Sequence, residues 1–469
     1  MSALPVPCQW SHCRLPIPLA SSRNRSRPLS HVKRIAHIAR SSTDRQWRLW
    51  MACAAAVPGS FQYGFGLSSI NVPQAGICRS LHLAPTSFTW SALVAILSPS
   101  GLLGAWLAPV AVSRLGLLRC LRSTSFFFII SGLIFPLAHH VSVSASTATV
   151  PLWLFALGRV VGGFGAGAAT VFVPLYLGQL APLHLRGAIG NLHQVAIVLG
   201  LLVAQLAGAF LPWPQALQMA AVFGMMQLCL IPFLRPVPDA VKKQDFQETE
   251  QKGFGALIRD PQVRRPLCMA VSLMALQQYC GINGVWYYST EFFTEVGLPH
   301  PLAGTLISAV IFMVATLAAV PLIEKAGRRS LLLRGQLGAA FSLMFLTSSL
   351  IAKSVGLGTM WTTQLALAAV ISFVVSFAIS LGPIPWQIAN EIFPLRCRAE
   401  AQCLIASLCE IFSASVAFGF PILEKTLGAK LAFTPSILVL VLGYAYVRRA
   451  LPETKNRKVE DILEDFNRR

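Results

Sequence analysis

Charged residues are scarce in this sequence, at 12% of 469 residues. A typical soluble domain carries roughly 25% charge, so a soluble fold of this chain would have an unusually apolar surface. Acidic residues number only 18, whereas hydrophobic residues make up 55% of the chain and the mean hydropathy is +0.62. These values exclude a disordered chain and an ordinary cytosolic enzyme, and they favour an integral membrane protein.

Cysteine and histidine form no recognisable metal-binding or disulfide pattern. The 11 cysteines are odd in number and most lie within apolar runs, where cysteine behaves as a small hydrophobic residue. The sequence also shows no phosphate-binding loop and no pairing of a nucleophile with a base. We therefore expect no metal, no cofactor and no enzymatic activity.

The net charge of +20 does not indicate a nucleic-acid partner, because the basic residues form no stripe interleaved with aromatics. Nine basic residues and one acid, Asp44, lie in residues 1–49. Many of the others lie in short connections between apolar runs. Basic connections on one side are typical of the cytosolic side of an integral membrane protein.

About twelve segments are apolar over the roughly 20 residues that a membrane-spanning helix needs. The first group is 50–70, 88–112, 122–139, 151–178, 187–210 and 214–234, and the second group is 267–290, 301–323, 330–352, 363–390, 401–423 and 431–450. The pattern predicts an all-α membrane protein of two six-helix halves. The expected divisions are a disordered basic tail (1–47), the first half (48–234), a cytosolic linker (235–266), the second half (267–450) and a C-terminal tail (451–469).

Two short motifs recur at nearly the same offset. Arg186 and Arg398 each follow, by seven residues, a Gln or Glu that precedes a proline-containing loop, and RLG at 114–116 matches KAG at 325–327. The offsets are 212 and 211 residues. We therefore expect the halves to be parallel repeats.

Loop charge predicts the orientation of the chain. One set of connections carries Arg114, Arg119, Arg122, Arg186, Lys325, Arg328, Arg329, Arg396 and Arg398, and the opposite set is nearly bare. Both termini are therefore expected in the cytosol. Residues 1–46 are rich in Ser and Arg, which fits a disordered tail, with a transit segment as the alternative.

Polar side chains within the apolar segments are candidate functional residues, because they are costly in lipid unless they pair or line a wet cavity. Gln194, Gln277, Gln278 and Asn283 carry amides, which both donate and accept hydrogen bonds and so suit a neutral, polyhydroxylated ligand. A helix unwound near Gly281 would bring the amides of Gln278 and Asn283 onto one wall. The alternative is that these amides join helices across the bundle.

The tenth segment contains GPIPW at 382–386, whose Gly and Pro residues predict a break in the helix. Trp386 then offers a flat apolar face against which a sugar ring can stack.

A second group of candidates is charged and is expected at cytosolic helix ends. It comprises Arg159, Arg186, Glu324, Arg328, Arg329, Glu391 and Arg398. These residues either set the topology or form an ion-pair network that clasps the two halves while the pore faces outward.

Several motifs together carry a family resemblance. They are GRVVGG (158–163), PLYLGQLAPLHLRG (174–187), HQ (193–194), QQYCGIN (277–283), EKAGRR (324–329), GPIPW (382–386), EIFPLRCR (391–398) and PETK (452–455). In this order and spacing the chain resembles the sugar porter family of the major facilitator superfamily over residues 48–457, most closely the facilitative hexose transporters. The resemblance implies the major facilitator fold and alternating access without covalent chemistry.

The resemblance also implies roles for particular residues. Gln194, Gln277, Gln278, Asn283 and Trp386 fall where the family contacts its hexose. Tyr287 and Tyr288 fall where the family has part of its outer gate.

Three departures from the family bear on substrate and energy coupling. Phe312 stands where the family often has a sugar-contacting Asn, and Cys409-Glu410 replaces an Asn-Trp pair. Gly66 occupies the place of an Asp that proton-coupled relatives carry in the first segment. The absence of that carboxylate favours a uniporter, while Glu410 is a possible coupling residue because a buried carboxyl can carry a proton.

The sequence thus predicts facilitative transport of a hexose such as glucose or fructose. The alternatives are a proton-coupled sugar or polyol symporter and a non-transporting sugar sensor. The expected partners are the sugar and membrane lipid, with no nucleic acid. The plasma membrane is the expected location and an organellar membrane the alternative, and the sequence leaves the sugar and the oligomeric state open.

Overall fold

The computed structural model describes residues 47–144, 149–182, 185–236, 254–286, 293, 299–357, 360–428 and 430–468. Residues 50–469 form one unit by their internal contacts. The described residues leave out nearly all of the expected tail at 1–47 and most of the expected linker at 235–266, so the domain boundaries stay predictions. They also leave out Tyr287 and Tyr288, so the expected outer gate stays a prediction. The described part of the chain is helical and contains no strand.

The first half of the chain contains eight named α-helices and a short 3-10 turn. They are α2 (Pro58–Ser68), α3 (Gln74–Ser80), α4 (Phe88–Ala95), α5 (Leu97–Leu115), α6 (Leu117–Ser144), α7 (Thr149–Leu180), α8 (Arg186–Phe210), α9 (Trp213–Leu230) and η2 (Ile231–Phe233).

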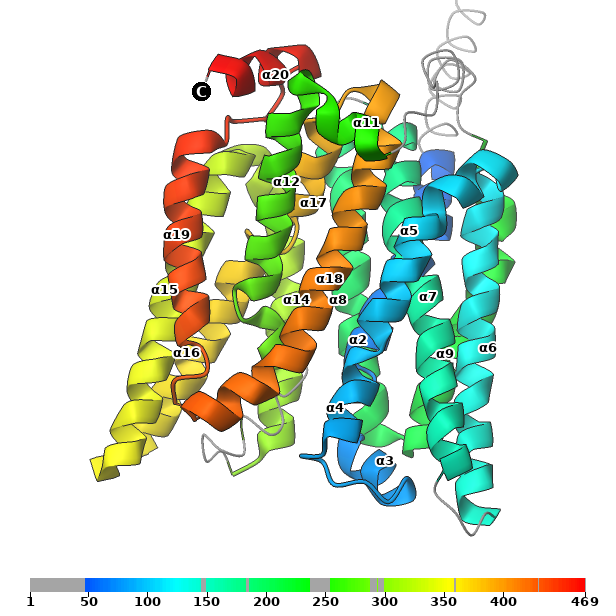
Figure 1. Ribbon diagram of the computed structural model, residues 1–469, viewed down its shortest axis with the longest axis vertical. Helices are drawn as coiled ribbons and strands as arrows, with labels where there is room; N and C mark the ends of the chain where they lie inside the picture. The colour runs from blue at the N-terminus through cyan, green and yellow to red at the C-terminus, as the bar shows by residue number, and fades with distance from the viewer. Residues whose placement is uncertain are drawn as a thin grey trace, which may run out of the picture. The chain divides into compact units, whose positions relative to one another are not determined.

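The second half of the chain continues the helical pattern. Its elements are α11 (Phe254–Arg259), α12 (Pro261–Tyr279), α14 (Pro301–Ala326), α15 (Arg328–Ala352), η3 (Lys353–Leu357), α16 (Met360–Ala378), α17 (Ile384–Glu391), α18 (Leu395–Leu427), α19 (Thr434–Ala450) and α20 (Val459–Arg468). In Figure 1, α20 and α11 lie at the same end of the bundle.

Nine helical stretches among the described residues are long and apolar enough to cross a membrane. Their outward faces carry large apolar side chains, such as Phe126 at 56% and Trp153 at 70% exposure. Such exposed apolar surface promotes aggregation in water, whereas it is stable in contact with lipid. The three other predicted segments fall on α2, α12 and α19, which are short or interrupted. The count of twelve therefore stays a prediction.

The two RLG and KAG motifs adopt the same turn, which supports the expected repeat. Gly116 joins α5 to α6 with φ 80° and ψ 150°, and Gly327 joins α14 to α15 with φ 85° and ψ 158°. This backbone region is open almost only to glycine. Each glycine ends one helix and starts the next, so equivalent helices leave equivalent turns.

The halves meet along two seams. At one seam α5 packs against α18, and at the other α8 packs against α14 (Figure 1). In the numbering of the predicted segments, one seam joins the second segment to the eleventh, and the other joins the fifth to the eighth. The eighth segment is the repeat of the second, and the eleventh is the repeat of the fifth. The relation between the repeats therefore exchanges the partners of the two seams. This exchange is what two parallel repeats related by a pseudo-two-fold axis produce.

Glycines allow the helices of the first half to approach closely. A Cβ on Gly64 would lie 1.9 Å from the Ile197 carbonyl oxygen, and one on Gly200 would lie 1.9 Å from the Phe61 carbonyl oxygen. Helices in lipid gain their association largely from such close backbone packing. The pairing of α2 with α8 fixes the helix that carries Gln194.

Candidate functional site

A break between α16 and α17 lies at the centre of the predicted sugar site. Pro383 and Pro385 have no backbone N–H, so they cannot donate to the carbonyls that precede them by four residues. The Leu381 carbonyl is one of these, and it is left to find another donor. The sequence therefore both ends α16 and exposes polar backbone inside the bundle.

Gln277 of α12 supplies that donor. Its Nε2 atom lies 2.8 Å from the Leu381 carbonyl oxygen and 2.8 Å from the Gly382 carbonyl oxygen. The side chain of Gln278 donates to Gln277 Oε1 at 3.3 Å and to Cys409 Sγ at 3.1 Å. The two amides therefore connect α12 to the helix break and to α18.

Asn283 joins the same cluster because the chain unwinds after α12. Gly281 has φ +99°, a conformation that favours glycine, and the Asn283 side chain donates to Gln278 Oε1. The expected meeting of Gln278 and Asn283 near an unwound Gly281 is confirmed.

The first half of the chain approaches this cluster through α8. The Gln194 Nε2 atom lies 3.2 Å from the position that a Gly382 Cβ would take. The Trp386 ring meets the His193 ring edge-to-face with centroids 5.2 Å apart, and His193 Nδ1 lies 2.7 Å from Ser60 Oγ of α2. The structure thus brings all five predicted sugar-contact residues to one region, where both halves contribute.

The four amides face the interior of the bundle, with residue exposures between 5% and 9%. We name Gln194, Gln277, Gln278 and Asn283 the amide cluster. A small cavity of about 30 Å³ lies elsewhere, within the first half, and includes Gln62, Gly66 and Arg159 in its lining. None of the five predicted sugar contacts lines that cavity, and three of the four amides bond to one another.

Phe312 of α14 stacks with Trp286, with ring centroids 5.0 Å apart and an interplanar angle of 27°, and lies 6.0 Å from the Phe377 ring. Phe377 also contacts the position of a Gly382 Cβ. An aromatic wall therefore borders the amide cluster where the family often has an amide.

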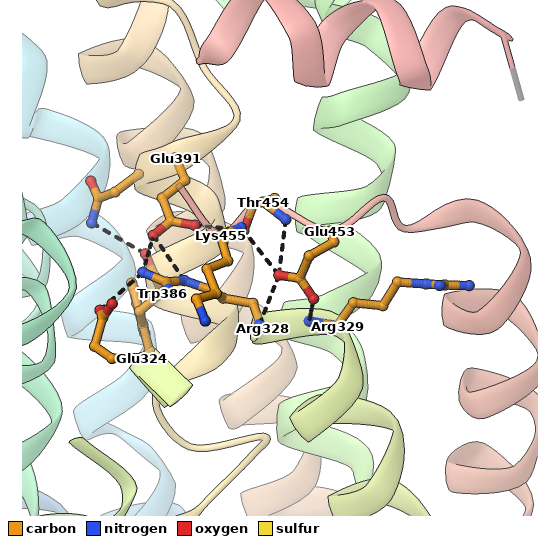
Figure 2. Close-up of polar contacts among 9 residues, drawn as sticks. Glu324, Arg328, Arg329, Trp386, Glu391, Glu453, Thr454 and Lys455 are labelled. Atoms are coloured by element: carbon orange, nitrogen blue, oxygen red, sulfur yellow. Dashed lines mark hydrogen bonds and ion pairs between the residues drawn. The ribbon is translucent and has the colours of Figure 1, made fainter. Parts of the chain in front are cut away.

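A second polar site lies at the end of the bundle where α14 ends and α15 begins (Figure 2). Arg328 Nη2 lies 2.9 Å from Glu391 Oε1 and 3.2 Å from Glu324 Oε1. The Arg328 side chain is buried and Glu391 is largely buried, whereas Glu324 is 40% exposed. We name these three residues the ion-pair cluster.

Burial raises the pKa of the Glu391 carboxyl above its ordinary value, and the Arg328 guanidinium and the Thr454 hydroxyl oppose that rise. A buried carboxylate is costly unless it is paired and hydrogen-bonded. Arg328 and Thr454 are therefore the two partners that favour the charged form of Glu391.

The PETK segment after α19 completes this site, a role that sequence reasoning missed. Glu453 accepts hydrogen bonds from the backbone N–H groups of Arg328 at 2.8 Å and Arg329 at 3.1 Å, so it caps the N-terminus of α15. Thr454 Oγ1 donates to Glu391 Oε2 at 2.6 Å, and Lys455 Nζ donates to the Lys325 carbonyl at 3.0 Å. The family signature at 452–455 was the only signal of these contacts (Figure 2).

The described ion pairs of this cluster lie within one half, and an ion pair between the two halves through Arg186 stays a prediction. The ion pairs of Glu324, Arg328 and Glu391 join α14, α15 and α17, all from the second half. The first half reaches the cluster through Gly187 of α8, where a Cβ would lie 1.5 Å from Glu324 Oε1 and 2.9 Å from Arg328 Nη2. The side chain of Arg186 lies outside the described part of the structure.

Arg159 is corrected, because it does not belong to this end of the bundle. It lies in α7 about 30 Å before the end of that helix at a rise of 1.5 Å per residue. Its guanidinium donates to the carbonyl oxygens of Gly66 at 2.8 Å, Val94 at 3.0 Å and Leu93 at 3.3 Å. Arg159 therefore joins α7 to α2 and α4.

Arg329 and Arg398 contact backbone rather than carboxylate side chains in their described hydrogen bonds. Arg329 Nη2 donates to the Arg448 carbonyl at 2.6 Å, and Arg398 Nε and Nη2 donate to the Phe393 carbonyl at 3.2 and 3.0 Å. Both residues thus fasten helix ends within the second half. The described residues contain no group of three His, Cys, Asp or Glu side chains that could hold a metal.

Comparison with known proteins places this geometry in a family. The model of the family described as "Sugar (and other) transporter" matches residues 51–239 and 235–466. The sheep (Ovis aries) protein "Solute carrier family 2, facilitated glucose transporter member 3" is 30% identical, covering 89% of this chain and 92% of its own length. The chicken (Gallus gallus) facilitated glucose transporter member 1 is 29% identical, covering 89% and 93%.

Solved structures show the same fold. A proton:xylose symporter of the major facilitator superfamily, bound to 6-bromo-6-deoxy-D-glucose, superposes with a TM-score of 0.75 at 21% identity, covering 90% of this chain and 99% of that chain. The E. coli xylose transporter in a partially occluded inward-open conformation gives a TM-score of 0.70 at 22% identity, covering 87% and 99%. With its helical bundle, its repeat turns and its amide cluster, this chain belongs to the sugar transporter family and is a multi-pass membrane protein with the major facilitator fold.

Proposed function

We propose that this protein transports a hexose, such as glucose or fructose, across a membrane by alternating access, and that the sugar gradient alone sets the direction. The observation that carries the proposal is the convergence of uncharged amides from both halves on the broken helix between α16 and α17. The relatives of similar sequence are named facilitated glucose transporters.

The amide cluster has the chemistry to bind sugar hydroxyls. Each amide offers donors and acceptors, and the Leu381 and Gly382 carbonyls add acceptors. A sugar would exchange its bonds to water for bonds to these groups while the amides give up bonds to one another. Each hydrogen bond then contributes only about 0.5–1.5 kcal/mol net, so affinity stays modest and the sugar can leave on the far side.

The ion-pair cluster and the PETK segment lie on the cytosolic side in this proposal. The basic connections between helices predict that side by the positive-inside rule, with both termini in the cytosol. Closure there requires Gly187 of the first half to rest against Glu324 and Arg328. We also propose the plasma membrane as its location, and the similarity to facilitated glucose transporters supports this as it supports the function.

Replacing Gln277 and Gln278 together by Ala tests the sugar site. We expect radiolabelled hexose uptake to fall to background in cells lacking their own sugar carriers, because the donors to Leu381, Gly382 and Cys409 are lost. Gln205→Leu is the matched control: Gln205 is a buried amide of α8 outside the cluster, and uptake should persist. Surface expression is measured for each variant, and undiminished uptake in the double variant would remove the amide cluster from the site.

A proton-coupled symporter is the second candidate, favoured by the buried Glu410 in α18. Sugar uptake measured with and without a protonophore distinguishes the symporter from the facilitative carrier. Facilitative uptake continues when the proton gradient is dissipated, whereas coupled uptake stops accumulating sugar. A chain that binds sugar in a thermal-shift assay yet moves none in this assay would instead be a sensor.

A further inference from the structure

Glu410 lies at the seam between the two halves, near the middle of α18. The residue is 3% exposed, and its carboxyl forms hydrogen bonds with Tyr63 of α2 and Ser98 of α5. Gly101 of α5 makes room for it, since a Cβ there would lie 3.1 Å from both Cδ and Oε2 of Glu410. A carboxyl from one half is thus held by hydroxyls from the other.

The surroundings of this carboxyl provide hydroxyls but no counter-charge. Among the residues that the structure describes, no lysine or arginine forms an ion pair with Glu410. The titratable groups facing it are Tyr63 of α2 and Cys409 of its own helix. Arg159 of α7 points its guanidinium at three backbone carbonyls, and α12 approaches through the uncharged Gln278.

Burial without a counter-charge favours a proton on Glu410. The Oγ atom of Ser98, one of its partners, also lies 3.1 Å from Ser413 Oγ. Ser98 and Tyr63 are the hydroxyl partners of the Glu410 carboxyl, and a protonated carboxyl can both donate to and accept from such hydroxyls. An ionised carboxyl at this depth would also lack the water that stabilises its charge.

The neighbouring residue links this seam to the sugar site. Cys409 Sγ accepts a hydrogen bond from Gln278 Nε2 at 3.1 Å, and Gln278 in turn accepts from Asn283. Cys409 and Glu410 are adjacent on one rigid helix. The Glu410 carboxyl and the amide cluster are therefore connected through one residue step of α18.

We propose that Glu410 is a proton-binding site at the seam between α18 and α5, and that its protonation allows this seam to close. When the seam opens, water reaches the carboxyl and the proton can leave. When it closes, the carboxyl regains a proton, because an ionised carboxyl would be buried without a counter-charge. A proton that binds and leaves from the same side controls the cycle without crossing the membrane, so the site also fits a facilitative carrier.

Infrared difference spectroscopy of the purified full-length protein tests the site without any transport. The spectrum of the wild type is compared with that of Glu410→Gln. We expect the wild type to show a band from a protonated carboxyl at neutral pH, and the variant to lack it. This readout does not rest on the proposed function. Absence of a band assignable to Glu410 would overturn the proposal.

The second readout is equilibrium exchange of radiolabelled hexose in proteoliposomes, with equal pH on both sides, and it does rest on the proposed function. Exchange by the wild type should fall several-fold from mildly acidic to alkaline pH, because an ionised Glu410 disfavours closure. Glu410→Gln imitates the protonated form and should give a flat profile. An unchanged pH dependence in Glu410→Gln would contradict the proposal.

Two further variants keep the test decisive if Glu410→Gln fails to fold. Ser98→Ala removes a hydroxyl partner of Glu410 and should shift the pH profile, whereas Ser413→Ala removes only the neighbouring seam bond and should keep the wild-type profile. Equal shifts in both would assign the effect to seam packing and refute the proton site. Loss of all exchange with the infrared band intact would instead count against the proposed transport.

Discussion

Gly66 shows how the absence of one side chain bears on energy coupling. The family resemblance implies that it stands where proton-coupled members carry an Asp, and Arg159 Nη1 donates to its carbonyl at 2.8 Å. A Cβ on Gly66 would meet only Leu97 side-chain carbons, at 3.6 and 3.8 Å, which is ordinary contact. A small cavity of about 30 Å³ also has Gly66 and Arg159 in its lining. A side chain at this position therefore has space at its Cβ, and the Arg159 guanidinium lies next to it.

We predict that Gly66→Asp makes sugar accumulation depend on a proton gradient. The new carboxylate would pair with Arg159 when ionised and release that pair when protonated, which links protonation to the contact between α7 and α2. Uptake with and without a protonophore measures the effect. Gly66→Asn fills the same space without an ionisable group, so equal behaviour of the two variants would show that the carboxylate adds no coupling.

At the scale of elements, single glycines decide how helices follow one another. Gly116 and Gly327 hold the same turn in the two repeats, but their surroundings differ. A Cβ on Gly116 would meet nothing within 4 Å, whereas one on Gly327 would lie 2.7 Å from Glu453 Oε2. The first turn thus needs glycine for its backbone alone. The second needs it also to admit the residue that caps α15.

We predict that Gly116→Ala lowers the free energy of unfolding by about 1–3 kcal/mol through backbone strain. Gly327→Ala should cost more, because it also displaces the Glu453 carboxylate and loses a cap worth about 1 kcal/mol. Thermal unfolding in detergent compares the two. Once Glu453→Ala has removed the cap, the two glycine variants should cost the same, and a persisting difference would contradict this account.

At the scale of the whole molecule, the two halves meet along two seams. The seam of α8 with α14 ends at Gly187, which rests against Glu324 and Arg328. In the proposed transport cycle, the ion-pair cluster of the second half is the surface on which the first half closes. Asn71 links the halves elsewhere, through a 3.0 Å hydrogen bond from its Nδ2 to the Trp286 carbonyl. This conformation therefore has contacts between the halves near the ion-pair cluster and at Asn71.

We predict that Gly187→Val opens the end of the bundle at the ion-pair cluster and slows hexose uptake by about tenfold or more, which corresponds to at least about 1.4 kcal/mol against closure. Hydrogen exchange followed by mass spectrometry should rise at Ile384–Glu391 in the same variant. Gly190→Val is the matched control on the same helix, because a Cβ there meets nothing within 4 Å. Equal exchange in both variants would exclude a closing role for Gly187.

The sequence by itself determined the membrane environment, the helical class, the repeat and the family. These follow from composition, from hydropathy over lengths set by the bilayer, and from motifs of residues close together in the chain. It also foresaw that Gln278 and Asn283 would meet, because glycine at 281 allows a local unwinding. Each of these inferences concerns forces that act over one helix or one turn.

Only the tertiary structure decided which distant groups meet. Arg159 has the same charge as Arg328, yet the Arg159 guanidinium donates to backbone carbonyls inside the first half, whereas the Arg328 guanidinium pairs with Glu391. Glu453 became a helix cap and Glu410 a seam residue because of helices far away in sequence. The physical reason is that hydrogen bonds and ion pairs act over a few ångströms, so their partners are fixed by packing between helices, which no local pattern of residues records.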